Sequence, residues 1–473
     1  MGNAQLAFAS IAEIGKLFRA RMLSPIELTR LLLERIERIN PKINAYITVC
    51  VESALKEAAK AEVELCGKSR GKRRDRGPLH GIPIALKDNI YTQDIRTTGG
   101  SEILHDFVPL HDAAVVLALK KAGAVILGKT NMHEFAYGVT TDNPHFGAAR
   151  NPWDLERSPG GSSGGSAAAL AAGLCYGSMA TDTGGSIRIP ASLCGVVGLK
   201  PGLGRVSTDG VIPLSITLDF VGPLARTVAD TAALLAPVFT SGSSGKKLGP
   251  AKIPLPRGRH PKLGIPKEFF FDIVHGDVQA EFEAALSGLQ KSGAQFKFIS
   301  MSYLGETEEA GNLIAWAEAT LYHQQAGWFP GRAAEYGEDV RRRLEMGAKV
   351  TAVDYLRARE TREKFIASFH AALEENHLDA IVVPTTPVAA PRIGEESVAI
   401  KGAMHPARAL LLRLNRPANL AGVPSISVPC GRTQQGLPVG LQLMAGWTDE
   451  PRLLELARRV EQECPLTVRP ELD

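Results

Sequence analysis

The sequence predicts an α/β fold from its size, its short apolar runs and the helical segments between them. The chain has 473 residues, of which 44% are hydrophobic and 22% charged, so it can bury a large core. Short apolar runs have the length and composition of buried strands. They lie at 82–86, 124–127, 380–383, 425–428 and 440–444. This length allows one large α/β domain or two to three ordinary ones.

The first 78 residues are predicted to form a helical scaffold. Ser24 and Glu27 make a capping box with Pro25 at the first helical position. The apolar spacing of 28–39 then continues the helix until Pro41, which should end it. A second helical segment covers 51–65.

Residues 79–235 alternate between predicted strands and helices. Helices are expected at 112–123, 166–174 and 228–235, and buried apolar segments at 187–193 and 196–199. Residues 240–262 change abruptly to Ser and Gly, then to Pro and basic residues, which is typical of a surface linker or insertion.

The C-terminal part, 263–473, is predicted to consist of helices and closing strands. Amphipathic helices are expected at 277–291, 307–325 and 339–371, and a final helix at 450–463. The closing strands are the runs at 380–383, 425–428 and 440–444.

Charge and cysteine usage narrow the class of protein. The net charge of +4 has no concentrated basic stripe, so direct binding of nucleic acid is not expected. The six cysteines are scattered without a C-x-x-C pair, which excludes the common zinc spacings and fits a reducing compartment. No basic-then-apolar leader and no run of about 18 apolar residues is present. We therefore expect a cytoplasmic protein with no membrane segment.

Two glycine-rich turns that carry serine are the candidate reactive elements. They are Gly-Gly-Ser-Ser-Gly-Gly at 160–165 and Thr-Gly-Gly-Ser at 183–186. Such turns present hydroxyls and bare backbone N–H groups, which can form a nucleophile and an oxyanion hole. Lys87 follows the strand predicted at 82–86, where desolvation can lower the pKa of its amine enough for it to act as a base. A Ser–Lys arrangement is a sound variant of nucleophilic catalysis.

Two other motifs compete with this interpretation. Residues 123–130 match the P-loop pattern G-x-x-x-x-G-K-[ST]. However, the four residues between the glycines form the predicted strand itself, so they cannot be an open phosphate-binding loop. Residues 160–164 match the nucleophile elbow G-x-S-x-G, but the polar segment before them, broken by Pro159, is no strand. No histidine stands out as a triad partner.

The sequence resembles the amidase signature family over about residues 5–463, and related proteins include the A subunit of glutamyl-tRNA(Gln) amidotransferase. The matching segments are GIPIALKDNI (81–90), GKTNMHEFAYG (128–138), NPWDLERSPGGSSGGSAAALAAG (151–173), TDTGGSIRIPASLCGVVGLKP (181–201) and GRVSTDGVIPLSITLDFVGPLARTVAD (204–230). The resemblance implies one domain over 1–473 with a large mixed central β-sheet covered by helices on both faces.

The resemblance also implies a Ser–cis-Ser–Lys triad. Lys87 matches the base, Ser162 matches the bridging serine after a cis peptide bond, and Ser186 matches the nucleophile. The backbone N–H groups of Thr183, Gly184, Gly185 and Ser186 match the oxyanion hole. Acyl transfer would then proceed through an acyl-enzyme on Ser186, without a metal or an organic cofactor.

The remaining site assignments concern the surroundings of the nucleophile. Asp182 and Arg188 flank its turn and are interpreted as supports for that turn, with recognition of a substrate carboxylate by Arg188 as the alternative. Met132 and Tyr137 are expected to line the substrate pocket.

Two functions within the family are consistent with this sequence: that of a stand-alone amidase and that of the amidotransferase A subunit. The amidotransferase A subunit usually has a tyrosine-rich helical stretch where this chain has 341–365 without paired tyrosines. It also usually has an aromatic or basic residue where this chain has Thr208 and Asp209. These departures favour a stand-alone amidase that acts on a small amide, with a homodimer left open. The alternative is the glutaminase A subunit, which supplies ammonia to partner subunits.

Overall fold

The computed structural model describes residues 2–67, 74–239 and 260–472. Within these residues, eleven strands form one sheet, and β10 (Ser397–Ile400) and β11 (Ala403–Pro406) form a separate hairpin. The strands of the large sheet are β1 Tyr46–Val49, β2 Pro83–Lys87, β3 Val125–Thr130, β4 Gly177–Asp182, β5 Val197–Lys200, β6 Phe220–Ala225, β7 Lys262–Pro266, β8 Gln295–Ile299, β9 Ala380–Pro384, β12 Ser425–Arg432 and β13 Pro438–Met444.

The order of strands across the sheet is β1-β3-β2-β4-β6-β5-β12-β13-β9-β7-β8. The sheet is mixed: β2 is parallel to both β3 and β4, and β7 is parallel to both β8 and β9. The strands from β4 to β9 in this order pair antiparallel. The parallel pair of β2 and β4 brings the ends of both strands, Lys87 and Asp182, to the same edge of the sheet.

Helices cover both faces of this sheet, as the resemblance implies. The helices α6 (Gly164–Ala171) and α7 (Arg188–Cys194) contact each other and the central strands. A second group of helices also contacts the central strands. Its members are α8 (Val228–Val238), α9 (Gly276–Lys291) and α15 (Glu450–Glu463). The predicted α/β fold class is therefore confirmed.

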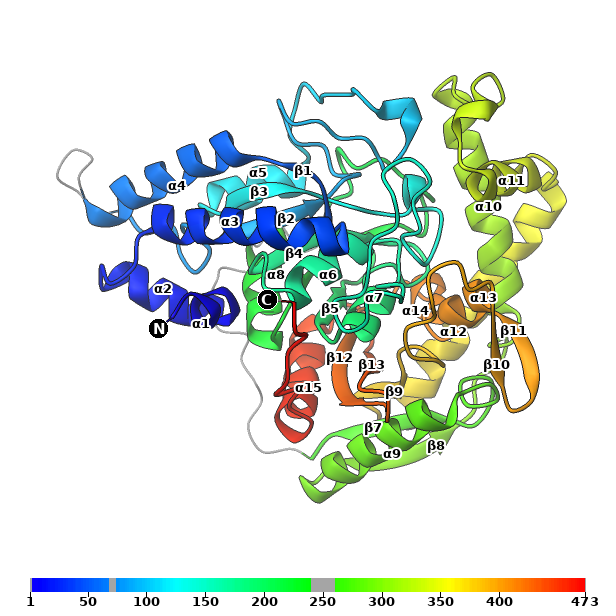
Figure 1. Cartoon of the computed structure of the whole chain (residues 1–473). Helices are drawn as coiled ribbons and strands as arrows, with labels where there is room; N and C mark the ends of the chain where they lie inside the picture. The colour runs from blue at the N-terminus through cyan, green and yellow to red at the C-terminus, as the bar shows by residue number, and fades with distance from the viewer. Residues whose placement is uncertain (1, 68–73, 240–259, 473) are drawn as a thin grey trace.

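The N-terminal helices form one end of the molecule (Figure 1). They are α1 Asn3–Phe8, α2 Ile11–Arg19, α3 Pro25–Ile43, α4 Val51–Cys66 and α5 Ala114–Lys121. The capping box of Ser24 and Glu27 is formed with Pro25 at the start of α3. The helix does not stop at Pro41, contrary to prediction, but continues to Ile43 and is capped by Asn44 in the left-handed conformation. Pro41 lies inside the last turn of the helix, where it lacks the backbone N–H that would donate to the carbonyl of residue 37.

The opposite end of the molecule carries α10 (Thr307–Gln325), α11 (Glu338–Gly347) and α12 (Ala352–Glu375) (Figure 1). The single helix predicted over 339–371 is wrong, because α11 and α12 are separate. Thr351 starts α12 with its own capping box to Asp354, which fixes a helix start within the predicted segment.

Shorter elements complete the described fold. They are α13 Ala407–Arg413, α14 Arg416–Leu420 and the 3₁₀ helices η1 Glu102–Leu104, η2 Glu134–Ala136 and η4 Ala333–Glu335. The linker or insertion predicted at 240–262 lies mostly outside the described residues, and Lys262 already belongs to β7.

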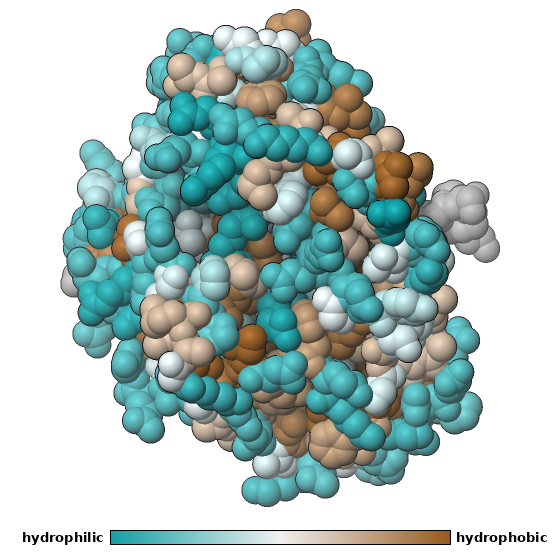
Figure 2. All heavy atoms as spheres, turned by 90° about the vertical axis from the view of Figure 1, so that its right-hand side faces the viewer, coloured by the Kyte–Doolittle hydropathy of each residue, from teal (hydrophilic) through white to brown (hydrophobic). Residues whose placement is uncertain are grey.

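The surface around α10–α12 carries several separate groups of apolar side chains among hydrophilic ones (Figure 2). In the described part of the chain, no helix combines the length and the apolar character needed to cross a membrane.

Candidate active site

Lys87 ends β2 with its side chain fully buried. Its Nζ donates hydrogen bonds to Ser162 Oγ at 2.7 Å and to Thr181 Oγ1 at 2.8 Å. Burial disfavours the charged amine and lowers the pKa of Lys87 to about 7, although Asp219 and Asp182 favour the charge. A large fraction of this lysine is therefore neutral near neutral pH.

Ser162 follows a cis peptide bond from Gly161 and lies just before α6. Its carbonyl accepts a hydrogen bond from His133 N at 3.1 Å. A Cβ at Gly161 would come within 2.7 to 2.9 Å of backbone atoms of residues 139–141. Glycine is required here because the chain passes directly against another backbone segment. This contact fixes the position from which the hydroxyl of Ser162 reaches Lys87.

The second glycine-rich turn connects β4 to α7 and carries Ser186. The carboxylate of Asp182 accepts hydrogen bonds from Gly185 N at 2.8 Å and Ile187 N at 3.1 Å. Burial alone would raise the pKa of Asp182, but the charge and hydrogen bonds of Arg188 hold it well below its usual range. Asp182 is therefore an anion that shapes the turn around Ser186.

Arg188 is fully buried and directs all five of its N–H donors to protein acceptors. Two of them reach Asp182, at 3.0 Å and 2.9 Å. The other three reach the backbone carbonyl of Asn415 and the side chains of Gln442 and Asn419. No donor of Arg188 is left for a substrate carboxylate.

The backbone N–H groups of the turn differ in their availability. The N–H of Gly185 is used by Asp182, whereas those of Thr183, Gly184 and Ser186 donate to no acceptor within the described ranges. The expectation that Gly185 belongs to the oxyanion hole therefore does not fit this geometry. Thr183 Oγ1 donates to Asp219, whose pKa is raised by burial to about 6.

A cavity opens beside this turn, and Ser186, Thr183 and Gly184 form part of its wall. Tyr137 also lines it, whereas Met132 is not among the lining residues and packs in a buried apolar cluster with Phe135. The rest of the wall comes from Ala136, Gly138, Val139, Leu214, Gly311, Ala315, Arg408, Leu412 and Arg416.

Sequence reasoning missed several polar residues of this site, among them Thr181, Arg408 and Arg416. Thr181 receives a hydrogen bond from Lys87 and lies within the matched segment 181–201, so the resemblance could have pointed to it. Arg408 and Arg416 line the cavity from α13 and α14, more than 200 residues after Ser186 in the chain. No local pattern links them to the serine turns, and only the fold brings them there.

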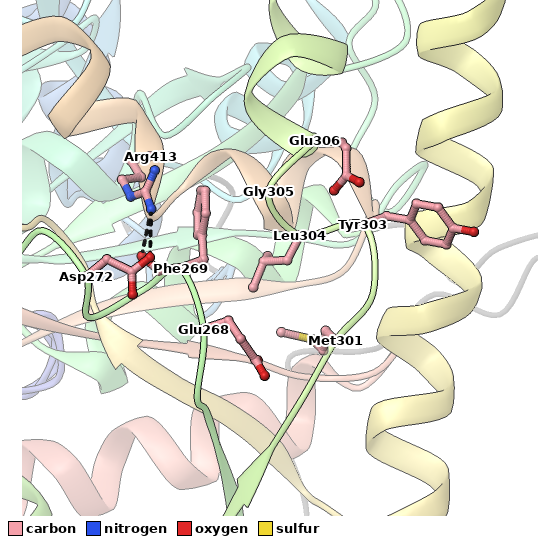
Figure 3. Close-up of a pocket in the computed structure, with 9 residues that line it drawn as sticks. All are labelled: Glu268, Phe269, Asp272, Met301, Tyr303, Leu304, Gly305, Glu306 and Arg413. Carbon is pink, nitrogen blue, oxygen red and sulfur yellow. Dashed lines mark hydrogen bonds and ion pairs between the residues drawn. The ribbon is translucent and has the colours of Figure 1, made fainter.

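A second cavity lies between the segments that follow β7 and β8 and the last residue of α13 (Figure 3). Its wall includes Glu268, Phe269, Asp272 and Arg413, and Arg413 pairs with Asp272 at 3.4 Å. None of the predicted catalytic residues lines this cavity.

The P-loop pattern at 123–130 forms β3 instead of a phosphate-binding loop. Lys129 is buried and donates to the carbonyl of Ile90 at 2.6 Å and to Thr97 Oγ1 at 2.7 Å. Its amine is therefore used inside the fold. Among the described residues, no group of three or more His, Cys, Asp or Glu side chains is arranged to hold a metal ion.

The chain is similar to known amidases over most of its length. A family model described as Amidase matches residues 27–454. The A subunit of glutamyl-tRNA(Gln) amidotransferase from Geotalea daltonii is 38% identical over 96% of both chains. A solved amidase has a TM-score of 0.88 at 34% identity, covering 96% of this chain and all of that one. The A subunit of the same amidotransferase from Thermotoga maritima has a TM-score of 0.79 at 34% identity, over 99% of this chain and 98% of that one. The chain therefore belongs to the amidase signature family, and it is an enzyme that acts on amide C–N bonds.

Proposed function

We propose that this chain is a glutaminase A subunit, which hydrolyses the side-chain amide of glutamine and supplies ammonia to partner subunits. The full-length similarity to the A subunit of glutamyl-tRNA(Gln) amidotransferase supports this role. It reverses the preference for a stand-alone amidase that the sequence alone suggests. Such a complex would work where tRNA is used, so we expect it in the cytoplasm.

The hydrogen bond between Lys87 and Ser162 is the main observation that supports the proposed reaction mechanism. Neutral Lys87 takes the proton of Ser162, which in turn takes the proton of Ser186 as the Ser186 oxygen attacks the amide carbon. The C–N bond then breaks, and the proton returns through Ser162 to the leaving ammonia. Water hydrolyses the resulting ester of Ser186 by the same route.

The backbone of the turn supplies the second part of the mechanism. The N–H groups of Thr183, Gly184 and Ser186 stabilise the negative oxygen of the tetrahedral intermediate. Asp182 and Arg188 act as positioning residues, because their hydrogen bonds hold the turn and they do not touch the substrate.

A stand-alone amidase is the second candidate, and one observation favours it. The residues that line the cavity include two arginines and no acidic side chain. Glutamine carries an α-ammonium group, for which this wall offers no carboxylate partner. A small amide without an ammonium group fits the same wall.

The test is ammonia release from a panel of primary amides, measured with the chain alone and with proteins that copurify with it when it is expressed from its native operon. The glutaminase role predicts release from glutamine that increases in the presence of partners. Robust release from neutral aliphatic amides, with none from glutamine under either condition, would establish the stand-alone amidase. If no ammonia is released from any amide, with or without partners, both the glutaminase role and the stand-alone amidase are excluded.

A further inference from the structure

Asp219 lies just before β6, and its carboxylate accepts three hydrogen bonds. One comes from the hydroxyl of Thr183, in the turn that carries Ser186. The other two come from the backbone N–H groups of Leu214 at 2.8 Å and Ser215 at 3.1 Å. Thr183 and Leu214 both line the cavity beside Ser186. One carboxylate therefore joins the nucleophile turn to another part of the cavity wall.

The nucleophile turn is held at two points, and Asp219 provides one of them. Asp182 accepts from the N–H groups of Gly185 and Ile187, which fixes the part of the turn next to α7. Thr183 lies at the other end of the turn, where its hydroxyl anchors it to Asp219. An oxyanion hole is effective because its donors are already aimed at the place where the charge develops. The anchor at Asp219 therefore bears on how well the Thr183 N–H can serve as such a donor.

The segment that Asp219 holds is itself fixed to α10. Glu318, on that helix, accepts from Ser215 Oγ at 2.6 Å and from Thr217 N at 3.0 Å. The segment is thus tied down on both sides by carboxylates. Asp219 consequently holds Thr183 against a support that lies outside the turn.

The carboxylate of Asp219 also acts on Lys87. Burial raises the pKa of Asp219 to about 6, and the nearby charge of Glu318 adds to this effect, so the group is mostly ionised at neutral pH. Its charge favours the cationic form of the Lys87 amine, as does the charge of Asp182. Asp182 is paired with Arg188, whereas the three hydrogen bonds of Asp219 come from uncharged donors. Loss of the charge at Asp219 should therefore make Lys87 easier to deprotonate.

We propose that Asp219 is a positioning residue for acyl transfer, whose carboxylate aims the backbone N–H of Thr183 at the reacting carbonyl and whose negative charge acts on the amine of Lys87. The inference rests on the proposed reaction at Ser186. Asp219 is not among the residues that line the cavity, so it acts through Thr183 and Lys87. Because substrate binding does not use the hydrogen bond between Asp219 and Thr183, its loss should lower kcat and leave KM nearly unchanged.

The first test removes the hydroxyl of Thr183 with little change of shape. Thr183→Val should lower kcat about tenfold, with KM nearly unchanged, for the amide that the wild type hydrolyses fastest. Thr183→Ser keeps the hydroxyl and should retain most of kcat. The matched control is Thr320→Val, which removes a buried hydroxyl that donates to the carbonyl of Leu344 and should keep kcat. An unchanged kcat in Thr183→Val, or an equal loss in Thr183→Ser, would overturn the proposal.

The second test removes the charge of Asp219 and keeps its hydrogen bonds. In Asp219→Asn, the amide N–H can donate to the hydroxyl of Thr183 while the amide oxygen accepts from Leu214 and Ser215. The pH at which kcat/KM is half-maximal, expected near 7 in the wild type, should fall by about one unit. Asp230→Asn on α8 removes another carboxylate that accepts a backbone N–H and should leave the profile unchanged. Identical profiles in Asp219→Asn and the wild type would contradict the action of Asp219 on the base.

A third measurement does not depend on which amide is the substrate. A small alkyl fluorophosphonate phosphonylates an activated serine with release of fluoride, and the phosphoryl oxygen takes the place of the oxyanion. Labelling of Ser186, followed by mass spectrometry, should be about tenfold slower in Thr183→Val than in the wild type or Thr320→Val. If the wild type is labelled at Ser186 but releases no ammonia from glutamine, the glutaminase role fails, and slower labelling of Thr183→Val still supports the role of Asp219. Equal labelling rates in Thr183→Val and the wild type, or no labelling of Ser186 in the wild type, would overturn the inference.

Discussion

Lys87 Nζ lies 2.7 Å from Ser162 Oγ, although the two residues are 75 positions apart in the chain. The sheet creates this contact, because the parallel pairing of β2 with β3 and β4 holds Lys87 at the edge where the first serine turn passes. Both groups are fully buried, so water does not compete for the amine or the hydroxyl. In the proposed mechanism, this pair connects the base, Lys87, to the hydroxyl that transfers the proton.

The pH dependence of activity should report the amine of Lys87. Its pKa of about 7 means that the neutral, proton-accepting form is lost as the pH falls below that value. We expect kcat/KM to be half-maximal near pH 7, to level off at higher pH, and to approach a tenfold fall per pH unit at lower pH. A profile from about pH 5 to about pH 9 checks this. A constant rate down to pH 5 would show that Lys87 is not the base.

Replacing Ser162 by Ala should stop proton transfer without unfolding the protein. We expect kcat to fall by about 10²–10⁴-fold, because Lys87 then has no hydroxyl through which to reach Ser186. Steady-state kinetics and circular dichroism would be measured together. The control is Ser163→Ala, since the hydroxyl of Ser163 donates to the carbonyl of Thr181 instead of to Lys87. Similar losses in the two variants would indicate a general effect on the turn.

Arg188→Lys should destabilise the fold despite keeping the charge. One ammonium cannot replace the five donors that reach Asp182, Asn415, Asn419 and Gln442. We expect a loss of about 3–5 kcal/mol in the free energy of unfolding, measured with urea.

The control for Arg188 is Arg341→Lys on the surface of α11. Arg341 approaches Glu345 at 3.8 Å, and both side chains are exposed. The free energy of unfolding of this control should change by less than about 1 kcal/mol. Equal effects of the two substitutions would contradict the role of Arg188 as a buried support.

Gly161→Ala should be among the most damaging small substitutions in the chain. The added methyl group would meet the backbone of 139–141 at 2.7 to 2.9 Å, and backbone cannot rotate away. We expect a clear fall in Tm, and a loss of activity because Ser162 moves with it. Gly276→Ala, where nothing lies within 4 Å of the new Cβ, is the matched control and should keep its Tm.

Much of the fold was predictable because local chemistry specifies it. The capping box of Ser24 and Glu27 starts α3, and the apolar run before Lys87 forms β2. By contrast, β4 reads Gly-Ser-Met-Ala-Thr-Asp and has no strand-like pattern. Its small residues fit only because it is buried between β2 and β6. The single-domain organisation over 1–473 stays a prediction.

The residues of the candidate site also fall into two groups, those that the sequence could identify and those that only the fold reveals. Lys87, Ser162 and Ser186 lie in matched segments, so resemblance alone points to them. Arg408 could not be found, because an arginine in a short helix looks like any surface charge until the fold places it beside Ser186. The use of the Gly185 N–H by Asp182 also needs the turn geometry, which no sequence pattern specifies.

The central claim is that Ser186 carries the acyl group. It is tested most directly by quenching the enzyme during turnover of an amide that it hydrolyses and mapping the adduct by mass spectrometry. We predict an acyl group on the peptide that contains Ser186, and neither adduct nor ammonia release in Ser186→Ala. An adduct on Ser162, or near-normal ammonia release by Ser186→Ala, would contradict the assignment.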